Sequence, residues 1–205
     1  MKKFFSLLTL ATAFAALPAV GCAADAGDPE ELQTEDNLTA SDAKIERDII
    51  AAVKGLDTDF MGTEADPMPY RVTHFSLKRG ETLTDAVMVK RLFPKLKGMD
   101  DYTEYGRHKG SQSITPAEFW SRRMETPVRS DFDSDEDFAK AQAAVAKWQK
   151  VKTLFETKLT KLNAVHLGWQ FPGDGSVENG TVALTIAGLT PKGQVIAIYG
   201  IVVWT

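Results

Sequence analysis

The carboxy-terminal segment, residues 195–205, constrains the fold more than any other stretch, because it is apolar at almost every position. Successive side chains of a β-strand point to opposite faces. One face would carry Val195, Ala197, Tyr199, Ile201 and Val203, and the other Ile196, Ile198, Gly200, Val202 and Trp204. Such a strand needs cover on both sides. We therefore expect it to lie inside a sheet with helices against both faces.

The other strands are predicted from alternation and turn chemistry. The segment YRVTHFSLK is typical of a modest strand, residues 164–171 alternate in polarity, and TVALTIAGL is joined to the last strand by the turn residues 190–193. Short connections between neighbouring strands favour antiparallel pairing. We predict an α+β fold, specifically a three-layer α/β/α sandwich around a largely antiparallel sheet of about four strands.

Helices are predicted where apolar residues recur at intervals of three and four. The longest runs from about Asp135 to Leu162, with lysines on its solvent face. A first helix would be capped by Ser41 or Asp42 and stop at Gly55, a short one would span residues 82–92, and another would be capped near Thr115 and Pro116. Residues 98–112 are polar and predicted to be irregular.

The first 22 residues have the three parts of a bacterial export signal: two lysines, an apolar run from Phe4 to Leu17, and small residues before a cysteine. Cys22 is the only cysteine of the chain, and AVGC is similar to a lipobox. We expect lipidation of Cys22 and retention as an outer-membrane lipoprotein facing the periplasm or the cell surface. The alternative is cleavage after Ala23 or Ala24, which would give a soluble periplasmic protein.

Residues 23–40 are predicted to form a flexible acidic tether, since they contain few large apolar groups. Six acids and no base occur in this stretch: Asp25, Asp28, Glu30, Glu31, Glu35 and Asp36. The formal net charge is −4, and removal of Lys2 and Lys3 with the signal would lower it by two, to −6. This balance disfavours direct binding of nucleic acid and leaves a basic protein partner open. The remaining residues, 41–205, are expected to form one domain.

The residue patterns that enzymes and metal sites require are missing from the sequence. His74, His108 and His166 do not stand at metal-ligand spacing, and His166 is expected on the surface of its strand. Carboxylates alternate after Asp131 as in a calcium loop, but Gln142 stands where the closing glutamate is required. We predict no cofactor and no enzymatic activity.

The order of elements resembles the nuclease A inhibitor family of bacterial proteins. The resemblance covers residues 45–205 and is strongest in the long lysine-bearing helix, the strand at VHLG, the strand TVALTIAGLTPKG and the final VVWT. The segments DFM and ITPAEFWSR through Thr126 and Pro127 also match landmarks of the family. The resemblance implies an inhibitor of a magnesium-dependent, nonspecific DNA/RNA endonuclease of the ββα-metal type.

The resemblance also implies which residues contact the nuclease. Thr205 matches the terminal threonine that enters the nuclease active site and meets the partner's magnesium ion. A hydroxyl beside an α-carboxylate offers the hard oxygen ligands that Mg²⁺ prefers. Glu64 lies near a contact glutamate of the family, and Asp131 with Phe132 matches an acidic-aromatic pair. Trp204, which replaces an acidic residue of the family, either joins this contact or packs as the end of the core strand.

Two other interpretations stay open. An envelope lipoprotein could keep this fold as an interaction module without a nuclease target. A hydrolase would need a site assembled around Tyr102, Tyr105 and His108 in the irregular segment.

Overall fold

The computed structural model describes residues 38–58, 68–96, 111–167 and 180–204, with side chains given for all but a few of them near 180 and 203. The chain divides into two compact units, Met1–Thr34 and Glu35–Thr205, and every described residue belongs to the second. In the described part of the chain, no helix combines the length and the apolarity needed to cross a membrane.

Within the described residues, five antiparallel strands form one sheet in the order β1-β5-β4-β3-β2. Their bounds are Arg71–Ser76 for β1, Ser111–Ile114 for β2, Thr160–Leu167 for β3, Gly180–Leu189 for β4 and Gln194–Trp204 for β5. The α+β class and the antiparallel sheet are confirmed, but the expected number of about four strands is wrong. The missed strand, β2, falls in a segment predicted to be irregular. Its sequence, SQSI, has a single apolar residue and is held by pairing with β3 at an edge of the sheet.

The hairpin of β4 and β5 is the centre of the sheet. It pairs in one unbroken register from Gly180 and Trp204 to Leu189 and Val195. The turn is closed by a hydrogen bond from Thr190 N to Gln194 O at 2.8 Å, and Gly193 adopts the positive φ of 83° that such a turn assigns to glycine. The described side chains of both strands are buried on both faces, apart from the half-buried Leu189 and Gln194 beside the turn.

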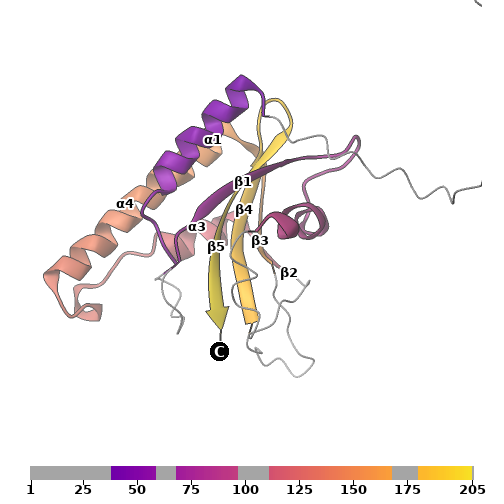
Figure 1. Ribbon diagram of the computed structural model, residues 1–205. Coiled ribbons are helices and arrows are strands. Elements are labelled where there is room, and N and C mark those ends of the chain that lie inside the picture. The colour runs from indigo at the N-terminus through magenta and orange to yellow at the C-terminus, as the bar shows by residue number, and fades with distance from the viewer. Residues whose placement is uncertain (1–37, 59–67, 97–110, 168–179, 205) are drawn as a thin grey trace, which may run out of the picture. The chain divides into compact units, whose positions relative to one another are not determined.

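The two larger hydrophobic clusters of the described residues lie against the sheet. The first joins Ile186, Ile196 and Ile198 of the strands to helices α1 (Ala40–Val53), α3 (Pro116–Arg123) and α4 (Asp135–Lys158). The second joins Val195, Ala197 and Tyr199 to the turns that follow β1: α2 (Asp85–Val87), the π-helical η2 (Met88–Leu92) and the 3-10 helix η3 (Phe93–Lys95). Since alternate residues of β5 enter different clusters, the clusters contact opposite faces. Figure 1 shows α1 and α4 side by side, apart from the short turns that follow β1.

The helix ends differ in detail from the predicted ones. Thr39, and not Ser41 or Asp42, caps α1 by accepting a hydrogen bond from Asp42 N at 3.3 Å. The predicted helix over residues 82–92 is a shorter α-helix capped by Thr84 and continued by π and 3-10 turns. The capping box of Thr115 and Glu118 confirms the predicted start of α3.

The long helix, α4, ends at Lys158 rather than near Leu162. Its amino end is capped by Ser134, whose hydroxyl accepts from Asp137 N at 3.1 Å. Trp148 and Phe155 are 1 % and 0 % exposed, and full burial of a side chain of this size contributes about 3 kcal/mol. Beyond Lys158, Leu159 is the carboxy cap and residues 160–162 already belong to β3.

Candidate functional site at the carboxy-terminal end of the sheet

The end of β5 extends beyond its neighbour β1. Arg71, the first residue of β1, pairs with Tyr199, so β5 has β1 as a neighbour only over residues 194–199. The following residues, 200–204, pair with β4 as far as Trp204 opposite Gly180. Figure 1 shows this end of β5 at the bottom of the sheet. Within this stretch Ile201 and Val202 are buried, at 3 % and 2 % exposed, so the end of β5 continues the core and its register is fixed by β4.

Gly200 marks the point where β5 passes the end of β1, and the packing there requires a glycine. A Cβ atom on Gly200 would lie 2.5 Å from Tyr70 Cε1 and 2.7 Å from Thr58 Cγ2. Both residues are buried, at 6 % and 2 % exposed. The ring of Tyr70 therefore packs directly on the backbone of β5 and fixes its position four residues before Trp204.

Tyr70 is held in turn by a buried arginine. Arg123 is 2 % exposed, and its Nε donates to Tyr70 Oη at 3.0 Å while its Nη1 donates to Phe119 O at 2.9 Å. The guanidinium stacks on the Phe119 ring at 3.5 Å from the centroid, and Tyr70 meets Trp148 edge to face at 4.7 Å. Together these contacts connect α3 and α4 to the residue that supports β5.

The charge of Arg123 is balanced by rings and by neutral oxygens. In the part of the chain that the structure describes, no carboxylate pairs with it, and its Nη2 has no hydrogen-bond partner. Burial lowers the pKa of Arg123 and raises the pKa of Tyr70, so the phenol is neutral at neutral pH. Sequence reasoning missed this cluster, although the four-residue interval from Phe119 to Arg123 places both on one face of α3.

His166 belongs to the same buried region, and its expected surface position is wrong. Its side chain is 2 % exposed, and Nδ1 lies 3.2 Å from Gln112 Oε1 of β2. Burial lowers the pKa of His166 to about 4, with smaller contributions from the charges of Arg123 and Arg122. The imidazole is therefore neutral at pH 7. The unforeseen strand β2 is what places β3, and His166 with it, inside the sheet.

Asp131 and Phe132 lie on a turn before α4. Asp131 ends the 3-10 helix η5 (Arg129–Asp131) and is exposed. Phe132 is half-buried, with its ring 5.8 Å from that of Phe138. The turn is held by Arg129, whose Nη1 donates to Phe132 O and whose Nε donates to Asp135 Oδ1, both at 2.6 Å. An acidic and an aromatic side chain are thus offered together from a fixed turn.

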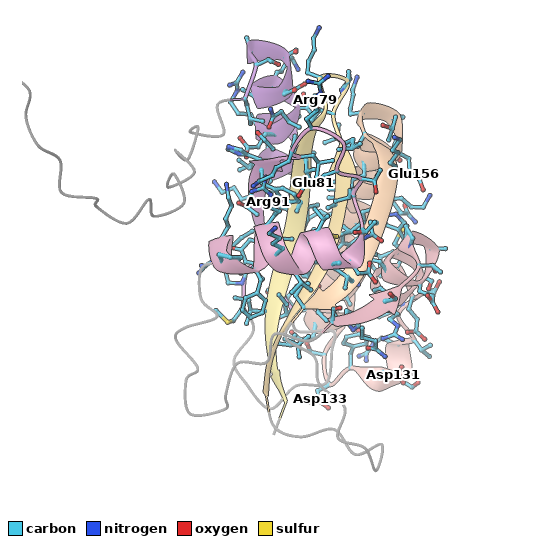
Figure 2. All side chains as sticks on the ribbon, turned by 90° about the vertical axis from the view of Figure 1, so that its right-hand side faces the viewer. Arg79, Glu81, Arg91, Asp131, Asp133 and Glu156 are labelled. Carbon is cyan, nitrogen blue, oxygen red and sulfur yellow. The ribbon has the colours of Figure 1, made fainter. Side chains whose placement is uncertain are left out.

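A groove beside this turn is lined by Phe132, by Leu56, and by Ala141 and Ala144 of α4. Asp131 lies toward the same end of the molecule as the end of β5 in Figure 2. In Figure 1, however, the amino end of α4 lies well to the side of β5. The structure does not bring this turn against the end of the strand, so a partner in contact with both would have to span the intervening surface.

The other predicted site residues are described only in part. The backbone of Trp204 belongs to β5, while the side chain of Trp204, the whole of Thr205, Glu64 and Cys22 lie outside the described residues. The same holds for His108, Tyr102 and Tyr105. Among the described residues, no three His, Cys, Asp or Glu side chains are grouped so that they could hold a metal ion.

The acidic run after Asp131 is accounted for by the start of α4. Asp135, Glu136 and Asp137 occupy the first turn of the helix, where carboxylates are stabilised by its dipole. Hydrogen bonds from Ser134 and Lys140 lower the pKa of Asp137. The carboxylates of this run therefore stabilise the start of α4.

No protein-family model matches the chain, and no curated protein matches it at a significant level.

Proposed function

We propose that this protein inhibits a magnesium-dependent, nonspecific endonuclease of the ββα-metal type by inserting its carboxy terminus into the nuclease active site. The observation that carries the proposal is the extension of β5 to Trp204, past the end of β1 and four residues beyond a glycine clamped by Tyr70. Thr205 is one peptide bond further on. A residue in that place is delivered at the tip of a strand whose register is fixed.

The chemistry proposed for the tip depends on oxygen atoms. The hydroxyl and α-carboxylate of Thr205 are hard ligands that suit the magnesium ion of the nuclease. The carboxylate also has the charge of the phosphate that this active site accepts. Asp131 and Phe132 form a second contact, Glu64 a third, and Trp204 lies between the core of the inhibitor and the interface.

The remainder of the molecule supports this role. In the proposed three-layer α/β/α arrangement, helices on both faces stiffen the sheet that carries the tip. The formal net charge of −4 favours fast association with the basic cleft of a nuclease. Lipidation of Cys22 would tether the inhibitor to the outer membrane through residues 23–40. Metabolic labelling with palmitate should mark the wild-type protein and leave Cys22→Ser unlabelled.

A pair of tagged proteins tests the inhibition. One carries an affinity tag before Ala23 and leaves Thr205 free, while its matched control carries the same tag after Thr205. Each is mixed with purified ββα-metal nucleases, and cleavage of plasmid DNA is measured in Mg²⁺. We expect a stable complex and inhibition with the first protein only. Equal inhibition by both would contradict insertion of the terminus, and inhibition by neither would favour an envelope interaction module without a nuclease target.

A further inference from the structure

A second surface suited to binding is a groove between α1 and β1, on the side of β1 that faces away from β5. The groove there has a volume of about 680 Å³, within the range of typical ligand sites. One wall is the outer face of α1 and the other is β1, an edge strand of the sheet. The lining of the groove includes Arg47 and Ile50 of α1, Lys54 at the carboxy cap of that helix, Val72 and His74 of β1, and Lys95.

The backbone of β1 faces this groove. Lys95 Nζ donates to the carbonyl oxygen of His74 at 3.2 Å, so this carbonyl points away from β5. Residues at intervals of two share the same backbone direction in an antiparallel strand, which places the backbone groups of Val72 on the groove side as well. A lysine at an edge strand is a common guard against strand addition. A carboxylate of a bound partner would accept a charge-assisted hydrogen bond from the Lys95 ammonium group and so release the His74 carbonyl.

The wall formed by α1 has a basic and apolar character that contrasts with the acidic balance of the chain. Arg47 lies within α1, Lys54 is the residue that caps its carboxy end, and both are exposed. Ile50 lies between them and is 47 % exposed, which is unusual for a large apolar side chain in the described part of this protein. Among the described residues that line the groove, Glu46 is the acidic one, and its Oε1 is engaged by His74 Nδ1 at 2.6 Å.

We infer that the groove binds an extended, acidic segment of a partner protein, which adds to β1 as a further strand. Its carboxylates meet Arg47, Lys54 and Lys95, an apolar side chain covers Ile50, and its backbone pairs with Val72. This mode of recognition takes affinity from main-chain hydrogen bonds and specificity from side-chain contacts. It goes beyond the proposed nuclease inhibition and uses none of the residues assigned to it.

Three labelled nine-residue peptides test the inference on the protein beginning at Ala23. The probe EVEVEVEVE has the alternation and charge required. EVEVEVEVE methylated at every backbone nitrogen keeps the charge but has no backbone N–H to donate, and KVKVKVKVK reverses the charge. We expect fluorescence anisotropy to detect binding of the first peptide only, with a shift of the Val72 amide signal in NMR. Equal binding of the N-methylated peptide would overturn strand addition. Binding of anionic phosphatidylglycerol vesicles but of no peptide would overturn it as well.

A pair of charge variants locates the binding. Arg47→Glu with Lys54→Glu should weaken binding of EVEVEVEVE at least tenfold. The matched control, Lys150→Glu with Lys158→Glu, changes the net charge equally on exposed positions of α4 and should bind as the wild type does. Equal loss in both variants would refute a site in this groove. Nuclease inhibition should survive both changes, so failure of the groove and failure of the proposed inhibition are separable.

Discussion

Replacing Gly200 with alanine should destabilise the protein and disturb the end of β5. The added Cβ would lie 2.5 Å from Tyr70 Cε1 and 2.7 Å from Thr58 Cγ2, whereas carbon atoms pack at about 3.5 to 4 Å. Either the ring or the strand must therefore move by about 1 Å. Overpacking of a core costs about 1–3 kcal/mol. Because Tyr70 is fixed by Arg123 and by Trp148, we expect a loss near 3 kcal/mol in the free energy of unfolding.

Gly188→Ala is a matched control for this experiment. Its Cβ would lie 2.5 Å from Leu162 Cδ2 and 2.9 Å from Leu159 Cβ, so it introduces a comparable conflict near the β4–β5 turn, away from the end of β5. Urea denaturation measures the loss of stability in both variants. At temperatures where both remain folded, we expect weakened nuclease inhibition from Gly200→Ala alone. Wild-type stability of Gly200→Ala, or equal inhibition by the two variants, would refute the clamp on β5.

Three further changes test the buried contacts. The pKa of His166 falls from an ordinary 6.5 to about 4 on folding. Between these pH values only the unfolded chain binds the proton, so the free energy of unfolding should drop by about 3 kcal/mol as pH falls from 6.5 to 4. His166→Gln should flatten this part of the stability profile, and an unchanged profile would contradict the burial of a neutral imidazole. Arg123→Lys should be more destabilising than Arg123→Met in thermal unfolding, because lysine keeps a buried charge but loses the stacking on Phe119, and the reverse order would contradict the account of this cluster. Thr115→Ala should cost about 1 kcal/mol in urea denaturation by removing the capping box of α3, and no loss would show that the cap is dispensable.

The sequence predicted well those helices and strands whose own spacing of apolar residues indicates which side chains are buried. The apolar residues of α4 recur at helical spacing, and those of β5 fill both faces, so burial follows from each segment alone. Where the environment comes from another segment, prediction failed. Strand β2 exists because β3 pairs with it, and His166 is buried because β2 and the arginines of α3 lie beside it.

In the candidate site, too, some residues were named from the sequence, while the contacts that hold them come from other segments. Asp131 and Phe132 were identified through a family resemblance, and the turn that presents them depends on Arg129, whose two hydrogen bonds no local pattern indicates. The cluster of Arg123, Tyr70 and Gly200 joins residues from three separate parts of the chain. A glycine in an apolar strand predicts close approach of some neighbour, but only the fold identifies that neighbour as Tyr70.

The most direct test of the proposed function is the inhibition constant of the protein beginning at Ala23, compared with the same protein lacking only Thr205, against one ββα-metal nuclease in Mg²⁺. We expect removal of Thr205 to weaken inhibition at least a hundredfold while the urea midpoint stays unchanged, because every strand pair described for β5, as far as Trp204 opposite Gly180, is retained. Equal inhibition constants for the two proteins would contradict insertion of the terminus into the nuclease.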